Sequence, residues 1–279
     1  MNPVNFRSVC IIAQKEIRDA KRNKWFVIVS ALFATLSLAF SFFGFSGLVS
    51  MGVAGFGRTT ASLLNLVFLI VPLMGLLLGT MSVASEREQG TLTTLLAQPV
   101  TAGEILLGKF LGTAAALVAT LLLGFGLSGL VISWYGGLVQ LGGYLVLVGF
   151  TVLLGLANLS VGFFISIFTR KNAAAVGFAL LFWFIFLFLS DLGLMGMTVA
   201  FKLPHQILFW LACLNPPEAF KLAVVGALHG GLEVFGAGGR YAVDRFGDWF
   251  PGFLALVFMC WILIPLGCAL VIFRKKCAE

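Results

Sequence analysis

Long apolar stretches dominate the chain, and shorter polar stretches separate them. Six apolar stretches are long enough to cross a membrane as helices, at 25–49, 61–83, 105–132, 139–168, 172–196 and 250–273. About 20 apolar helical residues cross a hydrocarbon core that is roughly 30 Å thick. The stretches lack the alternation of barrel strands, and a helix satisfies its own backbone hydrogen bonds in lipid. The pattern therefore predicts an all-α integral membrane protein with six transmembrane helices.

The segment before the first predicted span, residues 1–24, has a different pattern. Apolar side chains recur at helical spacing, at Val9, Ile12, Ala13, Ile17 and Ala20. The opposite face carries Gln14, Lys15, Arg18, Lys21 and Arg22. We expect an amphipathic helix at the membrane interface, with Trp25 as its anchor. A solvated basic tail is the alternative.

The stretch between the second and third predicted spans, residues 84–104, is polar and repeatedly interrupted. Ser85 and Glu88 have the S-x-x-E spacing of a capping box, in which two side chains satisfy free N–H groups at a helix start. Thr101 and Glu104 repeat that spacing just before the third span. The stretch therefore predicts a helix end, a short helix and a helix restart.

The short helix predicted inside this stretch covers residues 91–97, between Gly90 and Pro99, which interrupt helices. Its apolar stripe consists of Leu92, Leu95 and Leu96. A helix this short is marginal on its own, so these leucines need a partner surface. That surface is either another protein or the headgroup region, and a stretch much longer than a plain loop favours a protein.

The long segment between the last two predicted spans, residues 197–249, contains another predicted helix. Asn215 is placed to cap it, Pro216 suits its first position, and Glu218 completes the cap. Gly230 ends it. Its apolar body is too short to span a membrane, so we expect a re-entrant or surface-lying helix.

The basic residues are unevenly distributed, and they predict the orientation. On the six-span topology, 13 of the 18 lysines and arginines fall on the side of the termini. The positive-inside rule then makes both termini and residues 84–104 cytoplasmic, and residues 197–249 a periplasmic loop. The net charge of +7 and the mean hydropathy of +1.07 fit contact with anionic lipid, and we expect no nucleic-acid partner.

Glycine pairs occur within the predicted spans at helix-packing spacing. Gly75 and Gly79 form one GxxxG pair, and Gly108 and Gly112 form another. Such pairs let two helices approach closely, which favours a compact bundle.

Metal and disulfide chemistry have little support. The five cysteines include no CxxC pair, so we expect no disulfide within the chain. Met195, Met197 and His205 are soft side chains that suit Cu(I), near the outer end of the fifth span. Methionines two positions apart diverge on a helix and commonly fill interfaces. We therefore predict no metal or other cofactor in this chain, with these three residues as weak candidates.

Other function classes lack their characteristic residues. The run GEILLGKF has P-loop spacing, but Phe110 replaces the magnesium-binding Ser or Thr. No predicted span holds a buried acidic pair, which argues against a proton-coupled secondary transporter. No Ser/His or Cys/His pair falls at one membrane depth, which argues against an enzyme.

Residues 84–109 closely resemble the signature region of ABC-2 type permeases. The matching residues are Glu86, Glu88, Gly90, Thr91, Leu92, Leu95, Leu96, Pro99, Val100, Ile105, Leu106, Leu107, Gly108 and Lys109. The resemblance covers most of the chain, so we treat residues 1–279 as a single transmembrane domain.

The resemblance implies a permease subunit that is not itself an enzyme. Such permeases dimerise in the bacterial inner membrane and bind two cytoplasmic ATPase subunits, which hold ATP and magnesium. The short helix docks on the ATPase, so the implied coupling residues are Glu86, Glu88, Gly90, Thr91, Leu92, Leu95, Leu96 and Pro99.

A narrower resemblance concerns the opening MNPV and the outer-loop run NPPEAF. These are most similar to the permeases of nitrous oxide reductase maturation. That similarity implies copper or sulfur as cargo and a periplasmic partner at residues 197–249. An ABC-2 exporter of lipid-like or drug-like substrates is the alternative, and a secondary transporter is the second.

Overall fold

The structure is a computed structural model that describes residues 5–46, 55–136, 141–189, 205–228 and 245–278. Every regular element in these ranges is a helix. The elements are α1 (Phe6–Arg22), α2 (Lys24–Ser46), α3 (Gly55–Glu88), α4 (Thr91–Leu96), α5 (Ala102–Gly136), α6 (Leu141–Phe168), α7 (Asn172–Phe184), a π-helix (Ile185–Leu189), α9 (His205–Cys213), α10 (Pro216–Leu228), a 3₁₀-helix (Gly247–Trp249) and α12 (Phe250–Ala278). The predicted all-α class is confirmed.

Five helices are long and apolar enough to span a membrane, namely α2, α3, α5, α6 and α12. They correspond to five of the six predicted spans. The remaining predicted span begins as α7 and continues through the π-helix to Leu189, and its last residues lie outside the described ranges. The described part of that span, Asn172–Phe188, is a shorter apolar helix.

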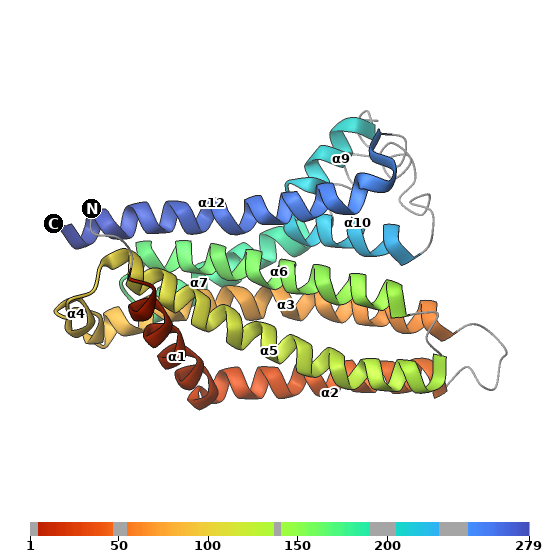
Figure 1. Cartoon of the computed structure of the whole chain (residues 1–279). Helices are drawn as coiled ribbons and strands as arrows, with labels where there is room; N and C mark the ends of the chain where they lie inside the picture. Colours follow the sequence, from red (N-terminus) through yellow and green to blue (C-terminus); the bar gives the residue numbers. More distant parts are fainter. Residues whose placement is uncertain (1–4, 47–54, 137–140, 190–204, 229–244, 279) are drawn as a thin grey trace.

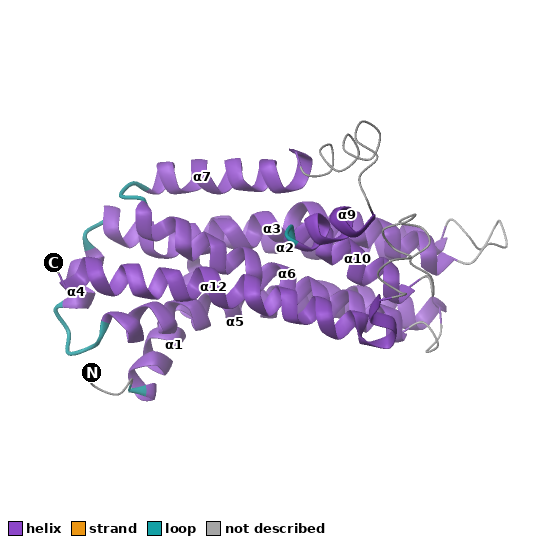
Figure 2. Cartoon of the chain, turned by 90° about the horizontal axis from the view of Figure 1, so that it is seen from above, coloured by secondary structure: helices purple, strands orange, loops and turns teal. Residues whose placement is uncertain are grey.

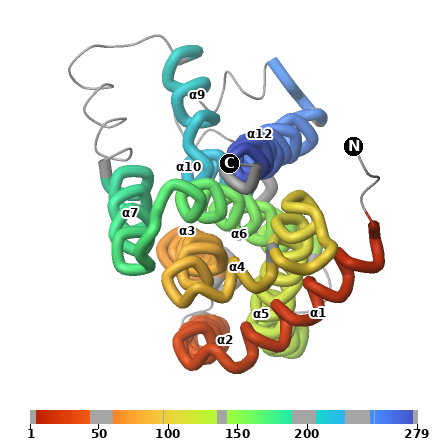
Figure 3. Tube along the Cα trace, turned by 90° about the vertical axis from the view of Figure 1, so that its left-hand side faces the viewer, coloured from red at the N-terminus to blue at the C-terminus, as the bar shows by residue number. Residues whose placement is uncertain are grey.

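The helices form an elongated bundle with α3 and α6 at its centre (Figures 1 and 3). α7 lies along one flank, as Figure 2 shows. Both ends of the chain and α4 lie at one end of the bundle, called here the termini end, while α9 lies toward the opposite, far end (Figure 1). An arrangement with both termini at one end agrees with an even number of membrane crossings.

Close backbone approach holds the two central helices together. A side chain added at Gly75 would lie 2.6 Å from the carbonyl oxygen of Gly155, and one added at Gly162 would lie 2.5 Å from that of Leu76. Only residues without a Cβ atom permit that distance. The predicted pair Gly75 and Gly79 is therefore the site at which α3 packs against α6.

The helix predicted to follow Asn215 is present as α10, and it folds back on α9 with a bend of 111°. Ala219, Phe220 and Val224 on α10 are fully buried, and the helix packs against α6, α3 and α12. α10 is thus inserted between other helices, as a re-entrant helix would be. The Asn215 amide donates a hydrogen bond of 2.8 Å to the carbonyl oxygen of Phe186 in the π-helix.

The weak metal candidates are not brought together in the described part of the chain. Met195 and Met197 lie outside it, and His205 is the first residue of α9. The described residues contain no group of three or more His, Cys, Asp or Glu side chains placed to hold a metal ion. The predicted end of α10 at Gly230 also lies outside the described residues.

Candidate functional site

α3 continues to Glu88, through the residues predicted to form the first capping box. Ser85 lies inside the helix, and its hydroxyl donates a hydrogen bond of 2.7 Å to the carbonyl oxygen of Met81. The prediction that Ser85 and Glu88 cap a helix start is therefore wrong. A serine inside a helix commonly bonds the carbonyl one turn earlier, so the spacing alone does not identify a helix start.

Gly90 separates α3 from α4. It has φ +73°, a left-handed conformation that favours glycine, and it directly precedes α4. The Thr93 hydroxyl then donates a hydrogen bond of 2.6 Å to the Gly90 carbonyl oxygen. The chain is thereby turned sharply into α4, in agreement with the predicted helix break.

The second predicted capping box is confirmed at the start of α5. The N–H of Glu104 donates to the Thr101 hydroxyl at 3.3 Å, and the N–H of Thr101 donates to Glu104 Oε2 at 2.8 Å. Glu104 Oε1 also accepts a hydrogen bond of 2.5 Å from the N–H of Asn5. One carboxylate thus joins the starts of α1 and α5.

α4 directs its first leucine inward. Leu92 is 6% exposed and belongs to the core of the bundle, and Leu95 is half-buried against the same core. The side chain of Leu96 is not described. The exposed surface of this segment consists of Thr91, Thr93, Thr94, Ala97, Gln98 and Pro99. Leu92 and Leu95 therefore hold α4 to its own chain, and the exposed side chains described on α4 are all threonines.

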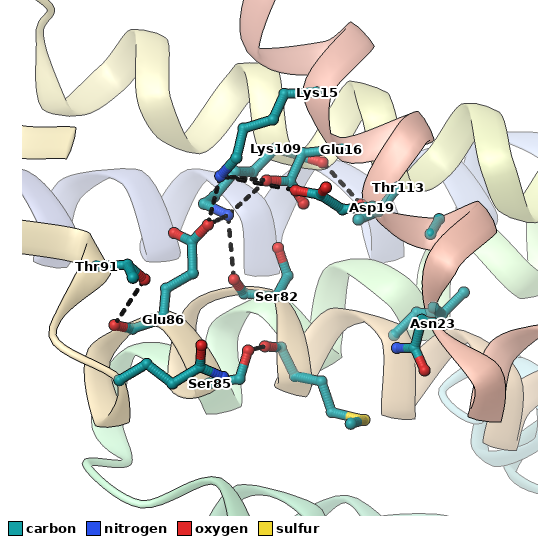
Figure 4. A pocket seen from close by; sticks show the side chains of 14 residues that line it. Lys15, Glu16, Asp19, Asn23, Ser82, Ser85, Glu86, Thr91, Lys109 and Thr113 are labelled. Atoms are coloured by element: carbon teal, nitrogen blue, oxygen red, sulfur yellow. Dashed lines mark hydrogen bonds and ion pairs between the residues drawn. The ribbon is translucent and has the colours of Figure 1, made fainter. Parts of the chain in front are cut away.

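A buried ion-pair cluster lies beside α4, where α1, α3 and α5 meet (Figure 4). Lys109 of α5 is only 1% exposed, and its ammonium nitrogen lies 2.7 Å from Glu16 Oε1 and 2.9 Å from Glu86 Oε1. It also donates to the carbonyl oxygen of Ser82 at 3.2 Å. An ammonium has three N–H donors, so these contacts use all of them. Lys109 thus connects α1 to the last turns of α3.

Lys15 extends this cluster toward solvent. Its ammonium nitrogen lies 2.9 Å from Glu86 Oε1, 3.8 Å from Asp19 Oδ2 and 3.9 Å from Glu16 Oε1. Partial burial alone would lower the pKa of Lys15, but the hydrogen bond to Glu86 and the nearby carboxylates raise it overall. The pKa of Glu16 is raised overall, mainly by burial and also by the nearby Glu86 carboxylate, although the Lys109 ammonium acts to lower it.

Two glycines of α5 allow α1 to approach it closely. A Cβ atom at Gly108 would lie 2.7 Å from that of Ile12, and one at Gly112 would lie 2.5 Å from the carbonyl oxygen of Ala13. The second predicted glycine pair is therefore the contact between α1 and α5. These glycines flank Lys109, which brings its ammonium within reach of Glu16.

Two consecutive side chains at the end of α3 hold the connection between α6 and α7. Arg87 Nη1 donates to the carbonyl oxygens of Ile167 and Thr169, at 3.1 and 2.9 Å. Glu88 Oε2 accepts a hydrogen bond of 2.8 Å from the N–H of Asn172, the first residue of α7. A cation at a helix C-terminus and an anion at an N-terminus both complement the helix dipole.

Sequence reasoning identified Glu86 and Glu88 as site residues but missed Lys15, Glu16 and Lys109 in this role. Glu16 lies four positions from both Ile12 and Ala20, on the face that α1 buries. An acidic residue on an apolar helix face signals a buried partner. That signal was present in the sequence, but it did not specify Lys109 as the partner.

These features are those of a membrane-embedded transport subunit. They are the helical bundle, the short helix after the second span and the buried cluster beside it. The sequence pattern of the ABC-2 family transporter proteins matches residues 10–277. The chain therefore belongs to the ABC-2 family and is a multi-pass ABC transporter permease, a class that works with an ATPase subunit.

The sequence is similar to two known proteins over most of the length of each. The chain is 34% identical to the probable ABC transporter permease protein NosY of Stutzerimonas stutzeri, over 95% of this chain and 97% of the relative. It is 35% identical to the protein of the same name from Pseudomonas aeruginosa strain PAO1, over 83% of this chain and 85% of the relative.

Proposed function

We propose that this permease passes ATP-driven movement of a cytoplasmic ATPase subunit into its helical bundle through α4 and residues 84–104. The observation that carries the proposal is the buried position of Lys109, which ties α1 and the end of α3 to α5 directly beside α4. Because these contacts are short and Lys109 itself is buried, a force on α4 moves the three helices together.

The proposed contact surface on α4 is its outward face. Thr94 is exposed on that face, whereas Leu92 is buried in the bundle. Among the residues proposed for coupling, Gly90 and Pro99 lie at the two ends of α4, and Leu92 and Leu95 hold α4 against the bundle. The ATPase lies against the exposed threonines of α4. Glu86 and Glu88 act from within the chain, because Lys109 and the start of α7 already occupy them.

The assembly we propose contains two copies of the chain and two ATPase subunits, in a bacterial inner membrane. The excess of basic residues on the side of the termini supports a cytoplasmic position for both termini and α4. Residues 197–249 then belong to the periplasmic side, with α10 inserted into the bundle, and we propose that a partner protein binds on that side.

The cellular role we propose is maturation of nitrous oxide reductase, with copper or sulfur as cargo. The support is the run NPPEAF and the similarity to two permeases named NosY. The test is complementation of a strain that lacks its own permease of this kind, with the copper content and visible spectrum of nitrous oxide reductase as readout. A normally loaded enzyme in the uncomplemented strain would contradict this role.

Thr94→Arg tests the docking surface. Arginine at an exposed position on α4 leaves the fold intact but obstructs a closely packed contact, so at least tenfold less ATPase subunit should copurify. The matched control is Gln206→Arg, at an exposed position on α9 far from α4, which should retain the ATPase. Undiminished copurification with Thr94→Arg would show that α4 is not the docking element.

A further inference from the structure

A polar cavity of about 350 Å³ opens in the angle between α1, α3 and α5 (Figure 4). It is lined by Lys15, Glu16, Asp19, Ala20, Asn23, Leu78, Met81, Ser82, Ser85, Glu86, Gln89, Thr91, Lys109 and Thr113. The ion-pair cluster forms only one wall. The remaining space is large enough for a headgroup-sized polar molecule.

A shallow apolar groove of about 30 Å³ adjoins this cavity between α2 and α3. The two hollows share Asn23, Leu78 and Met81. The groove is otherwise lined by Trp25, Phe26, Val29, Met74 and Leu77, which are all apolar or aromatic. The polar cavity and the groove therefore form one continuous amphipathic site, called here the elbow site because it lies where α1 turns into α2.

The change from polar to apolar follows one face of α3. Ser85 and Ser82 line the polar cavity, and Leu78 and Met74 follow at spacings of four residues. Residues at these spacings lie above one another on a helix. From residue 85 to residue 74 the helix rises about 16 Å. The polar part lies toward the termini end and the apolar part toward the bundle centre, as in a phospholipid lying along a protein.

The hydrogen-bonding groups of the polar cavity indicate which kind of polar group it can bind. The N–H donors of Lys109 are all in use, whereas Glu86 Oε2 and Ser82 Oγ are buried without a hydrogen-bond partner among the described residues. Two lysines face three carboxylates in the lining, which leaves a formal charge of −1. An occupant must therefore bring hydrogen-bond donors and a positive charge.

We propose that the elbow site binds a phospholipid with a primary ammonium headgroup, of the phosphatidylethanolamine class. The ammonium lies against the carboxylates of Glu86 and Asp19, and the phosphate lies near the half-exposed ammonium of Lys15. One acyl chain packs over the outer surface of the groove, beside Leu78. An anionic headgroup without an ammonium is disfavoured because the cavity already carries excess negative charge.

Lipid competition on the purified full complex tests the headgroup. After delipidation, the complex is exposed to an equal mixture of phosphatidylethanolamine, phosphatidylcholine and phosphatidylglycerol, and retained lipid is counted by native mass spectrometry. We expect at least fivefold preference for phosphatidylethanolamine over phosphatidylcholine, whose methylated headgroup has no N–H donors. Equal retention of the two, or preference for phosphatidylglycerol, would overturn the proposal.

A pair of tryptophan variants tests the location. Leu78→Trp fills the apolar groove and should abolish the preference. Leu69→Trp is the matched control, because residue 69 is exposed on the opposite face of the same helix and should leave the preference unchanged. If Leu78→Trp fails to fold, Asp19→Asn at a half-exposed position takes its place, and the preference should fall at least threefold. Unchanged preference in the tested variant would overturn the proposal.

Soluble phosphoethanolamine distinguishes a lipid from a free polar metabolite. Because the groove contributes apolar contact, we expect phosphoethanolamine to displace the lipid only at more than a hundredfold excess. Displacement at equal concentration would overturn the assignment to a lipid. Copurification of the ATPase is measured alongside, so failure of the elbow site is separable from failure of the proposed coupling role.

Discussion

The two ends of the bundle hold their charged side chains in different ways. At the termini end, Lys109 pairs with Glu16 across 93 positions of sequence, so the ion pair joins separate helices. Toward the far end, Lys221 pairs with Glu218 at 3.1 Å, three positions away on α10. Lys221 also lies 3.9 Å from the ring centroid of Phe68 on α3.

Aromatic rings provide much of the contact between elements at the far end. The ring of Phe209 on α9 lies 6.3 Å from that of Phe250 and 6.2 Å from that of Phe253, both on α12. Phe246 stacks on Phe253 at 4.4 Å. Apolar burial is non-directional, whereas buried ion pairs depend strongly on geometry. The contacts at the termini end therefore tolerate less change in geometry than the aromatic contacts at the far end.

The largest effect should come from removing the ammonium of Lys109. Lys109→Met leaves the buried Glu16 carboxylate without its nearest partner and leaves Glu86 paired with Lys15 alone, so we expect about 3–5 kcal/mol of lost stability. Lys221→Met should cost about 1–2 kcal/mol, because Glu218 lies in the first turn of α10, where the helix dipole stabilises an anion. Thermal unfolding of both variants in one detergent provides the measurement, and equal losses would contradict the comparison.

Phe209→Ala should destabilise the far end while leaving coupling intact. Phe209 is 2% exposed, and loss of its ring should cost about 3 kcal/mol. ATPase copurification should nevertheless remain normal, because no contact at the termini end changes. Comparison with Lys109→Met then separates stability from coupling. If Phe209→Ala also released the ATPase, the division between the two ends would be wrong.

Gly112→Ala and Gly126→Ala compare two positions on α5. An added methyl group at residue 112 meets the backbone of α1, whereas at residue 126 it meets no atom within 4 Å. We expect Gly112→Ala to cost about 1–3 kcal/mol through overpacking. Gly126→Ala should be neutral or stabilising by up to about 1 kcal/mol, since alanine favours helix. Unfolding midpoints check both values.

The smallest effect concerns alkaline pH. The pKa of Lys15 is raised overall, so its contribution to stability is present below the ordinary lysine value of about 10.4 and is lost as pH rises through the higher folded value. Because Lys15 is half-exposed, the loss should be under about 1 kcal/mol. Lys15→Gln should remove this dependence, as unfolding at several pH values between 9 and 11 would show. An identical pH dependence in both proteins would exclude Lys15 as its source.

The sequence predicted the fold well because apolar length alone defines a spanning helix. It also predicted the breaks at Gly90 and Pro99 and the cap formed by Thr101 and Glu104, since these depend on neighbours within a few residues. The glycine pairs predicted close packing but not which helices pack. The role in nitrous oxide reductase maturation and the partner proteins stay predictions.

The ion-pair cluster could not be predicted because its members are distant in sequence. No local pattern connects Glu16 with Lys109, and their pairing follows only from the way α1 lies across α5. The direction of Leu92 was missed for a related reason. A leucine stripe shows that one face of a short helix is apolar, but not whether that face turns toward its own bundle or outward.

The connection between α6 and α7 has a mechanical consequence. Glu88 holds the first residue of α7, and about 21 Å further along this apolar rod the carbonyl oxygen of Phe186 accepts the amide of Asn215. α7 and the π-helix therefore connect the last turn of α3 to the turn between α9 and α10 through one hydrogen bond at each end. If the last turn of α3 shifts along its axis, these two bonds are the direct link by which the shift reaches that turn.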